Sequence, residues 1–336
     1  MSQSQSQSQS QSQSQSQSQS QSQSQSQSQA TYHILHETSY RYSVPVRLSH
    51  QVLRLTPRFL PWQTCTSHTI NVSPAPQNVH MFVDSFGNAL QSLSLDQDHS
   101  NLEVIAESWV DIASRPLPAV TPPWQQVAAA LSYRAGRILP PEMLEASCFL
   151  FESSHVRIKR EFALYAADCF APDASLLDGI GALMRRIFNE FTFDPLATTV
   201  STPVTEVFIN KRGVCQDYAH FMLSCLRSMG LAARYVSGYL LTQPPPGQAR
   251  LVGADASHAW VSVYCPGIDG QPGCWIDADP TNGIFPDISH ITLGWGRDFL
   301  DISPLRGVLI GGGQQTMQVA VTVMPTEEIP GLPFAR

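Results

Sequence analysis

The chain has almost no lysine and no long hydrophobic run, and these shortages exclude several classes of protein. Two Lys stand against 18 Arg in 336 residues, the basic residues form no block, and the formal net charge is −7. This balance argues against nucleic acid or an anionic membrane as the main partner. No apolar stretch approaches the ~18 residues of a membrane-spanning helix, and no charged start precedes an apolar signal segment.

Cysteine is present in an odd number without paired spacing. The seven cysteines contain no CxxC motif, so the sequence predicts neither a disulfide framework nor a zinc site. We therefore expect a soluble, cytoplasmic protein in a reducing compartment, without a metal or cofactor. The length allows two domains, each with its own hydrophobic core.

The N-terminus is a low-complexity repeat. Residues 2–29 are 14 consecutive Ser-Gln dipeptides, which carry no charge and no apolar side chain. Such a tract has no apolar surface to offset its ordering entropy, so the sequence predicts a disordered tail over residues 1–30. The composition fits either a repeat without function or an association-prone Gln-rich segment.

Residues 31–113 have the pattern of a β domain. Turn residues separate short alternating runs, which is typical of an antiparallel β-sandwich. The expected strands cover residues 32–42, 51–56, 68–72, 79–83, 89–95 and 102–110. Beyond them we expect a Pro-rich linker with helices over 114–160, an α+β catalytic domain over 161–324 and a C-terminal tail over 325–336.

A helix over 214–229 places one cysteine in its first turn. Apolar or small residues recur at helical spacing from Cys215 to Met229, and Gly230 follows as a natural stop. The free N–H groups and positive dipole end of a helix favour a thiolate on Cys215 and an oxyanion beside it. A buried structural role is the alternative for Cys215, and it suits the mid-helix Cys225 better.

A β-hairpin predicts the partners of this cysteine. Residues 259–264 and 274–279 are strand-like, and a turn-rich segment separates them. If Cys265 lies opposite Cys274, His258 and Asp279 are diagonal neighbours on one face, roughly 7 Å apart. Asp277 is one step farther from His258, although a register slip of two residues would reverse this preference.

The resulting order is a nucleophile, a base and an orienting carboxylate. A thiol reacts as thiolate, an imidazole can hold its proton, and a carboxylate fixes the imidazole tautomer. We therefore predict Cys215, His258 and Asp279 as the catalytic residues of acyl-transfer chemistry. His220 lies on another side of the helix from Cys215, and Asp217 is expected to support the helix start. Cys265 and Cys274 are expected in the core rather than as metal ligands.

Four sequence segments carry a family resemblance. They are Gly213-Val214-Cys215-Gln216-Asp217-Tyr218-Ala219-His220, Gly238-Tyr239, His258-Ala259-Trp260 and Asp279-Pro280-Thr281-Asn282. With them the chain resembles the bacterial transglutaminase-like family, and residues 31–112 resemble the N-terminal domain that often precedes its core.

The resemblance implies a papain-like α+β fold and the same three catalytic residues. It also implies a thioester intermediate and a protein or peptide substrate. The acceptor is either an amine, which gives a cross-link, or water, which gives proteolysis or deamidation. An inactive papain-like binding module is the alternative of another class.

Overall fold

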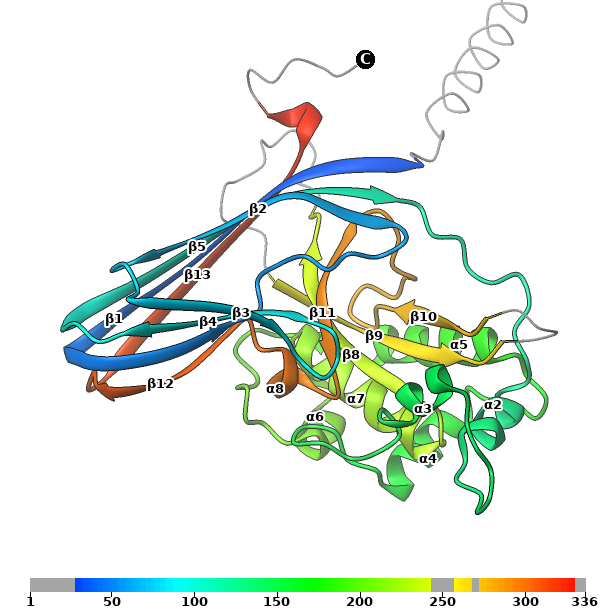
Figure 1. The fold of residues 1–336 in the computed structure, drawn as a ribbon. Coiled ribbons are helices and arrows are strands. Elements are labelled where there is room, and N and C mark those ends of the chain that lie inside the picture. Colours follow the sequence, from blue (N-terminus) through cyan, green and yellow to red (C-terminus); the bar gives the residue numbers. More distant parts are fainter. Residues whose placement is uncertain (1–27, 243–256, 268–271, 330–336) are drawn as a thin grey trace, which may run out of the picture.

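The computed structural model describes residues 28–242, 257–267 and 272–329. An elongated antiparallel sheet, built largely from the N-terminal part of the chain, extends away from a compact part in which helices pack on a second sheet (Figure 1). The predicted Ser-Gln tail lies almost wholly outside the described residues. Its predicted end at residue 30 is slightly late, because the first strand begins at Gln29.

The elongated sheet has seven strands, and β1 lies at its centre. Their order is β2-β5-β1-β4-β3, and two C-terminal strands also pair with β1. The strands are β1 (Gln29–Leu53), β2 (Gln63–Ser73), β3 (Asn78–Val83), β4 (Ala89–Leu95), β5 (His99–Ala113), β12 (Leu305–Gly311) and β13 (Gln315–Pro325).

The two halves of β1 have different neighbours. The first half lies between β5 and β13, and the second lies between β4 and β12. An apolar cluster then joins Leu93 and Leu95 of β4 to Leu102 and Val104 of β5. Strands on both sides of β1 in this one seven-stranded sheet therefore share a core.

Two sequence-based boundaries differ from the structure. The expected strand over 32–42 and the first half of the one over 51–56 belong to one continuous strand, β1, which ends at Leu53. Residues 305–324, which we placed in the catalytic domain, form β12 and most of β13 in the N-terminal sheet. A central strand needs neighbours on both edges, and these two come from the far end of the chain. Local alternation does not show such a pairing.

The compact part is an antiparallel four-stranded sheet, order β10-β9-β8-β11, packed with helices. Its strands are β8 (Ala233–Leu240), β9 (Ser257–Cys265), β10 (Cys274–Ala278) and β11 (His290–Gly296). The helices are α2 (Trp124–Leu131), α3 (Pro141–Ser147), α4 (Arg160–Ala167), α5 (Leu176–Glu190), α6 (Val204–Asn210), α7 (Cys215–Ser228) and α8 (Phe299–Ile302). Two-residue strands β6 (Thr192–Phe193) and β7 (Arg212–Gly213) pair before α7, and a 3₁₀ turn, η1 (Thr326–Glu328), follows β13.

Helix α7 is the central helix of this part. Its apolar face joins strands β8, β9 and β10 in one core, together with the stripe of α5. The predicted hairpin register is confirmed, since Cys265 pairs with Cys274 and Val261 pairs with Ala278. Within the described ranges, no helix is both long and apolar enough to cross a bilayer.

Strand β13 joins the two parts of the molecule through buried valines. Val321 is fully buried in a cluster with Tyr239 and Ile291 of the other sheet. Val321→Ala should lower the free energy of unfolding by about 1–3 kcal/mol, because it removes buried methyl groups and leaves a cavity. Urea unfolding measures this change. Val319→Ala on the same strand is the control, since Val319 is 46% exposed and should change stability by less than about 0.5 kcal/mol.

Candidate active site

Cys215 is the first residue of α7, as the sequence predicts. The Asp217 carboxylate fixes this helix start by accepting hydrogen bonds from the Val214 N–H at 2.9 Å and the Thr198 hydroxyl at 2.6 Å. Gly213 leaves room for the carboxylate, because a Cβ there would lie 2.4 Å from an Asp217 oxygen. The half-buried thiol of Cys215 therefore sits beside N–H groups that have no intrahelical partner.

His258 lies at the start of β9, with its ring buried. Its Nε2 is 2.7 Å from Oδ2 of Asp279. Burial lowers the pKa of His258, but hydrogen bonds with Asp279 and Cys215, and the charges of both, outweigh it and raise the pKa to about 10. Both partners therefore favour the protonated imidazole, which is the form that balances a thiolate once the Cys215 proton has moved to it.

Asp279 is fully buried just beyond β10. Its Oδ1 accepts from the backbone N–H groups of Thr281 and Asn282, and its Oδ2 accepts from the Asn282 side-chain amide at 2.7 Å. Burial raises the pKa of Asp279, and its hydrogen bonds with His258 and His290 overcome that effect and lower the pKa. The carboxylate is thus held as an anion against the imidazole.

His290 is a contact that sequence reasoning missed. It lies at the start of β11, and its Nε2 is 3.2 Å from the same Oδ2 of Asp279. The Ser289 hydroxyl lies 3.0 Å from its other ring nitrogen. In the strand order β11 lies two strands away from β9. The spacing of residues within the β9–β10 hairpin therefore could not predict the contact of His290.

Trp260 lies against both imidazoles. Its ring centroid is 6.1 Å from that of His258 and 5.2 Å from that of His290. A Cβ on Gly238 would lie 2.6 Å from the indole, so Gly238 allows Trp260 to approach β8.

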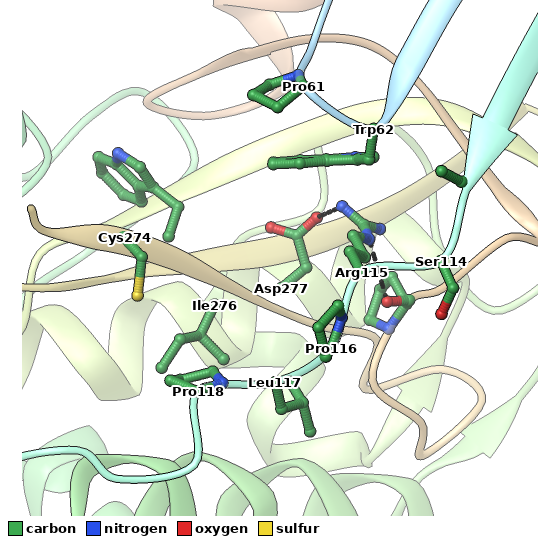
Figure 2. Close-up of a pocket in the computed structure, with 13 residues that line it drawn as sticks. Pro61, Trp62, Ser114, Arg115, Pro116, Leu117, Pro118, Cys274, Ile276 and Asp277 are labelled. Carbon is green, nitrogen blue, oxygen red and sulfur yellow. Dashed lines mark hydrogen bonds and ion pairs between the residues drawn. The ribbon is translucent and has the colours of Figure 1, made fainter. Parts of the chain in front are cut away.

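Asp277 belongs to a separate network. Its Oδ2 accepts from Arg115 at 2.7 Å and from the Trp260 indole N–H at 3.1 Å. Arg115 and Asp277 line a pocket of about 400 Å³ between the linker and the edge strand β10. The Trp62 ring also lines this pocket and lies over the ion pair (Figure 2). His258 thus lies in hydrogen-bonding distance of Asp279, the aspartate that the hairpin geometry favours, whereas Asp277 accepts hydrogen bonds from Arg115 and Trp260.

The remaining candidates lie elsewhere. His220 stacks on His155 at 4.9 Å and accepts a hydrogen bond from the Phe299 N–H. Cys225 and Cys265 are buried in the core as expected, whereas Cys274 is exposed. Cys274 departs from the core prediction because β10 is an edge strand.

The donor set around Asp279 suits protons better than a metal. His258, Asp279 and His290 each offer a ligand atom within 4.8 Å of the others. Tetrahedral zinc holds its ligands at about 2.0–2.1 Å, which separates neighbouring ligand atoms by roughly 3.3 Å. The 2.7 Å contact between His258 and Asp279 is too short for two ligands of one zinc ion, and it is a normal charge-assisted hydrogen bond.

Comparison with known families gives two matches along the chain. Residues 32–111 match the bacterial transglutaminase-like N-terminal region. Residues 165–280 match the transglutaminase-like superfamily, and this match contains Cys215, His258 and Asp279.

Individual relatives agree with these matches. An uncharacterised protein of Mycobacterium tuberculosis is 37% identical over 304 residues, which are 88% of this chain and 93% of that protein. A protein-glutamine gamma-glutamyltransferase of Pseudomonas aeruginosa is 32% identical over 114 residues, 32% of this chain and 16% of that enzyme. The crystal structure of a candidate cysteine protease from Cytophaga hutchinsonii has the same fold, with a TM-score of 0.68, 17% identity and coverage of 89% and 91% of the two chains.

The thiol environment predicts which cysteine reacts first. Cys215 should be alkylated fastest by iodoacetamide near pH 7, because it lies at a helix start and its thiol acts on His258. Peptide mass mapping over time measures the rates. Cys274 is the competitor, since a hydrogen bond from Cys265 is the main cause that lowers its pKa to about 7.

Two variants separate these thiols. Fast alkylation should persist in Cys274→Ser and disappear in Cys215→Ser. The opposite pattern would contradict the assignment of the nucleophile.

Proposed function

The chain belongs to the transglutaminase-like superfamily, and on that premise we propose that it is a thiol acyl-transfer enzyme acting on glutamine and peptide amides through Cys215, His258 and Asp279. One observation carries the proposal. A fully buried, hydrogen-bonded Asp279 holds His258, and the Cys215 thiol at the start of α7 also acts to raise the pKa of this histidine. A carboxylate, an imidazole and a helix-start thiol in contact are the requirements of nucleophilic acyl transfer.

The first half-reaction forms a thioester. The Cys215 thiol gives its proton to His258, and the thiolate attacks the amide carbonyl. We expect the backbone N–H of Cys215, at the start of α7, to donate to the resulting oxyanion. The C–N bond then breaks, and His258 protonates the departing ammonia or amine. The sulfur keeps the acyl group.

In the second half-reaction an acceptor takes the acyl group from sulfur. We propose a primary amine as the acceptor, in line with the similarity to a glutamyltransferase. Hydrolysis of a peptide or isopeptide bond is the second candidate, because the fold also matches that of a candidate cysteine protease. A binding module without activity is disfavoured, since binding alone does not require the buried contact between His258 and Asp279.

The partner of the site is a protein or peptide that presents a glutamine or an amide bond, with an amine as co-substrate. Neither nucleic acid nor a membrane is part of this proposal, because the net charge is −7 without a basic block. We also propose a cytoplasmic location, as the cysteine content of the sequence predicts.

The acceptor can be identified from one incubation. A Gln-containing peptide and a labelled primary amine are mixed with the protein, and label incorporation, ammonia and cleaved peptide are measured together. Intact mass should show Cys215 carrying the peptide minus ammonia, and rising amine concentration should speed the loss of this adduct. Cys215→Ala is the control and should form no adduct.

Other outcomes select other functions. Cleavage at a rate that does not depend on the amine would replace transfer by hydrolysis. The absence of any adduct across a Gln and peptide library would favour the binding module.

The two aspartates should separate chemistry from stability. Asp279→Asn should lower kcat by orders of magnitude, since His258 loses its orienting charge. Asp277→Asn should leave kcat much closer to wild type and lower the free energy of unfolding by roughly 1–3 kcal/mol, because Arg115 loses a charged hydrogen-bond partner. Steady-state kinetics and urea unfolding of both variants measure this. Equal kcat losses would show that Asp277 also acts on the base.

A further inference from the structure

One carboxylate oxygen serves two imidazoles in this protein. Oδ2 of Asp279 is 2.7 Å from Nε2 of His258 and 3.2 Å from Nε2 of His290. Both His290 and Asp279 have fully buried side chains. The proposed reaction uses only one of these imidazoles, so the second requires its own explanation.

The hydrogen bonds define the protonation state of His290. A carboxylate only accepts, so Nε2 of His290 must carry the hydrogen that points at Asp279. In a neutral ring Nδ1 is then an acceptor, and the Ser289 hydroxyl lies 3.0 Å from it. Burial lowers the pKa of His290, which favours this neutral form, although the Asp279 hydrogen bond and charge oppose it.

We infer that His290 is a positioning residue, whose Nε2–H holds Asp279 in place and limits how strongly that carboxylate retains the proton on His258. The inference rests on the proposed function and assigns a role that the three predicted residues leave open. A hydrogen bond donated to a carboxylate withdraws part of its charge from its other partner. His258 must release its proton to a leaving amine, and an imidazolium that binds its proton less tightly is the better acid.

The charged groups around this pair support the assignment. His258 faces Asp279 and Cys215, while His290 faces Asp279, His258 and the positive charge of Arg115. Arg115 is itself paired with Asp277 at 2.7 Å. Asp279 is therefore the anion that both rings share, and removing the His290 donor leaves the charge on Oδ2 to His258 and to the uncharged side-chain amide of Asn282.

Two amide side chains give a matched test. In His290→Gln the side-chain amide has an N–H near the position of the His290 Nε2. In His290→Asn the side chain is shorter, so its amide does not reach Oδ2 of Asp279. Both variants are made in the Cys215→Ala protein, so that no thiolate contributes, and His258 is titrated by ¹⁵N NMR of the imidazole nitrogens. The pKa of His258 should rise by about one unit in His290→Asn and stay near its starting value in His290→Gln.

A buried histidine outside the site controls for lost packing. His36 is 2% exposed and bonds to Tyr239, so His36→Asn removes a comparable group without touching Asp279. It should leave the titration of His258 unchanged. Equal titrations of His258 in His290→Asn and His290→Gln would overturn the inference.

The protein without a His290 substitution gives a second test. Its ¹⁵N spectrum at pH 7 should show His290 as the Nε2–H tautomer with an unprotonated Nδ1. An Nδ1–H tautomer or an imidazolium would overturn the inference even if the variants did not fold.

Kinetics in the protein with Cys215 intact complete the test. With KM unchanged, His290→Asn should lower kcat roughly tenfold through poorer positioning and a weaker acid, and His290→Gln should recover most of it. A kcat that is equal in both variants would contradict the positioning role. The NMR titration needs no substrate, so it can succeed even if no thioester forms and the proposed function fails.

Discussion

The buried charge of Asp279 is the constraint on which the rest of the site depends. An ionised carboxylate without solvent contact is costly unless hydrogen bonds replace its water. Five N–H groups do so here, two from the backbone of Thr281 and Asn282 and three from side chains. They come from β9, from β11 and from the loop after β10. Satisfying one anion therefore fixes three segments relative to one another, and the orientation of His258 follows from that requirement.

A second layer ties the site to the N-terminal sheet. The indole of Trp260 contacts both imidazoles with its ring and donates its N–H to Asp277. Arg115 completes the pair with Asp277, and this arginine lies on the linker that leaves the N-terminal sheet. A change in the position of the linker would thus reach the ring that packs on His258. The N-terminal part is thus connected to the site through this linker, although it supplies none of the three predicted catalytic residues.

Patterns of apolar residues along the sequence predicted the features that depend on neighbouring parts of the chain. The stripe of α7 placed Cys215 at a helix start, and alternation in the hairpin gave the register that brings His258 to Asp279. The continuity of β1 and the pairing of its edges with β12 and β13 were not predictable in this way, because they join segments more than 250 residues apart. The same reason hid His290 and Arg115. His290 lies at the site because β11 is in the same sheet as β9, and Arg115 lies there because of the path of the linker. The residues next to them in the sequence do not indicate these contacts.

The contacts of His258 also change in strength during the proposed reaction. Both the Asp279 carboxylate and the Cys215 sulfur help to raise the pKa of His258 in the free protein. Once the sulfur is acylated it carries no charge and accepts no strong hydrogen bond, so its share of that stabilisation disappears. Burial of the ring still opposes the charged form, and Asp279 alone then supports it. The His258 imidazole consequently binds its proton tightly while the thiolate exists, and it gives up this proton more easily after the sulfur has attacked. Having released that proton, it is free to act as the base for the incoming acceptor, with no movement of the backbone required.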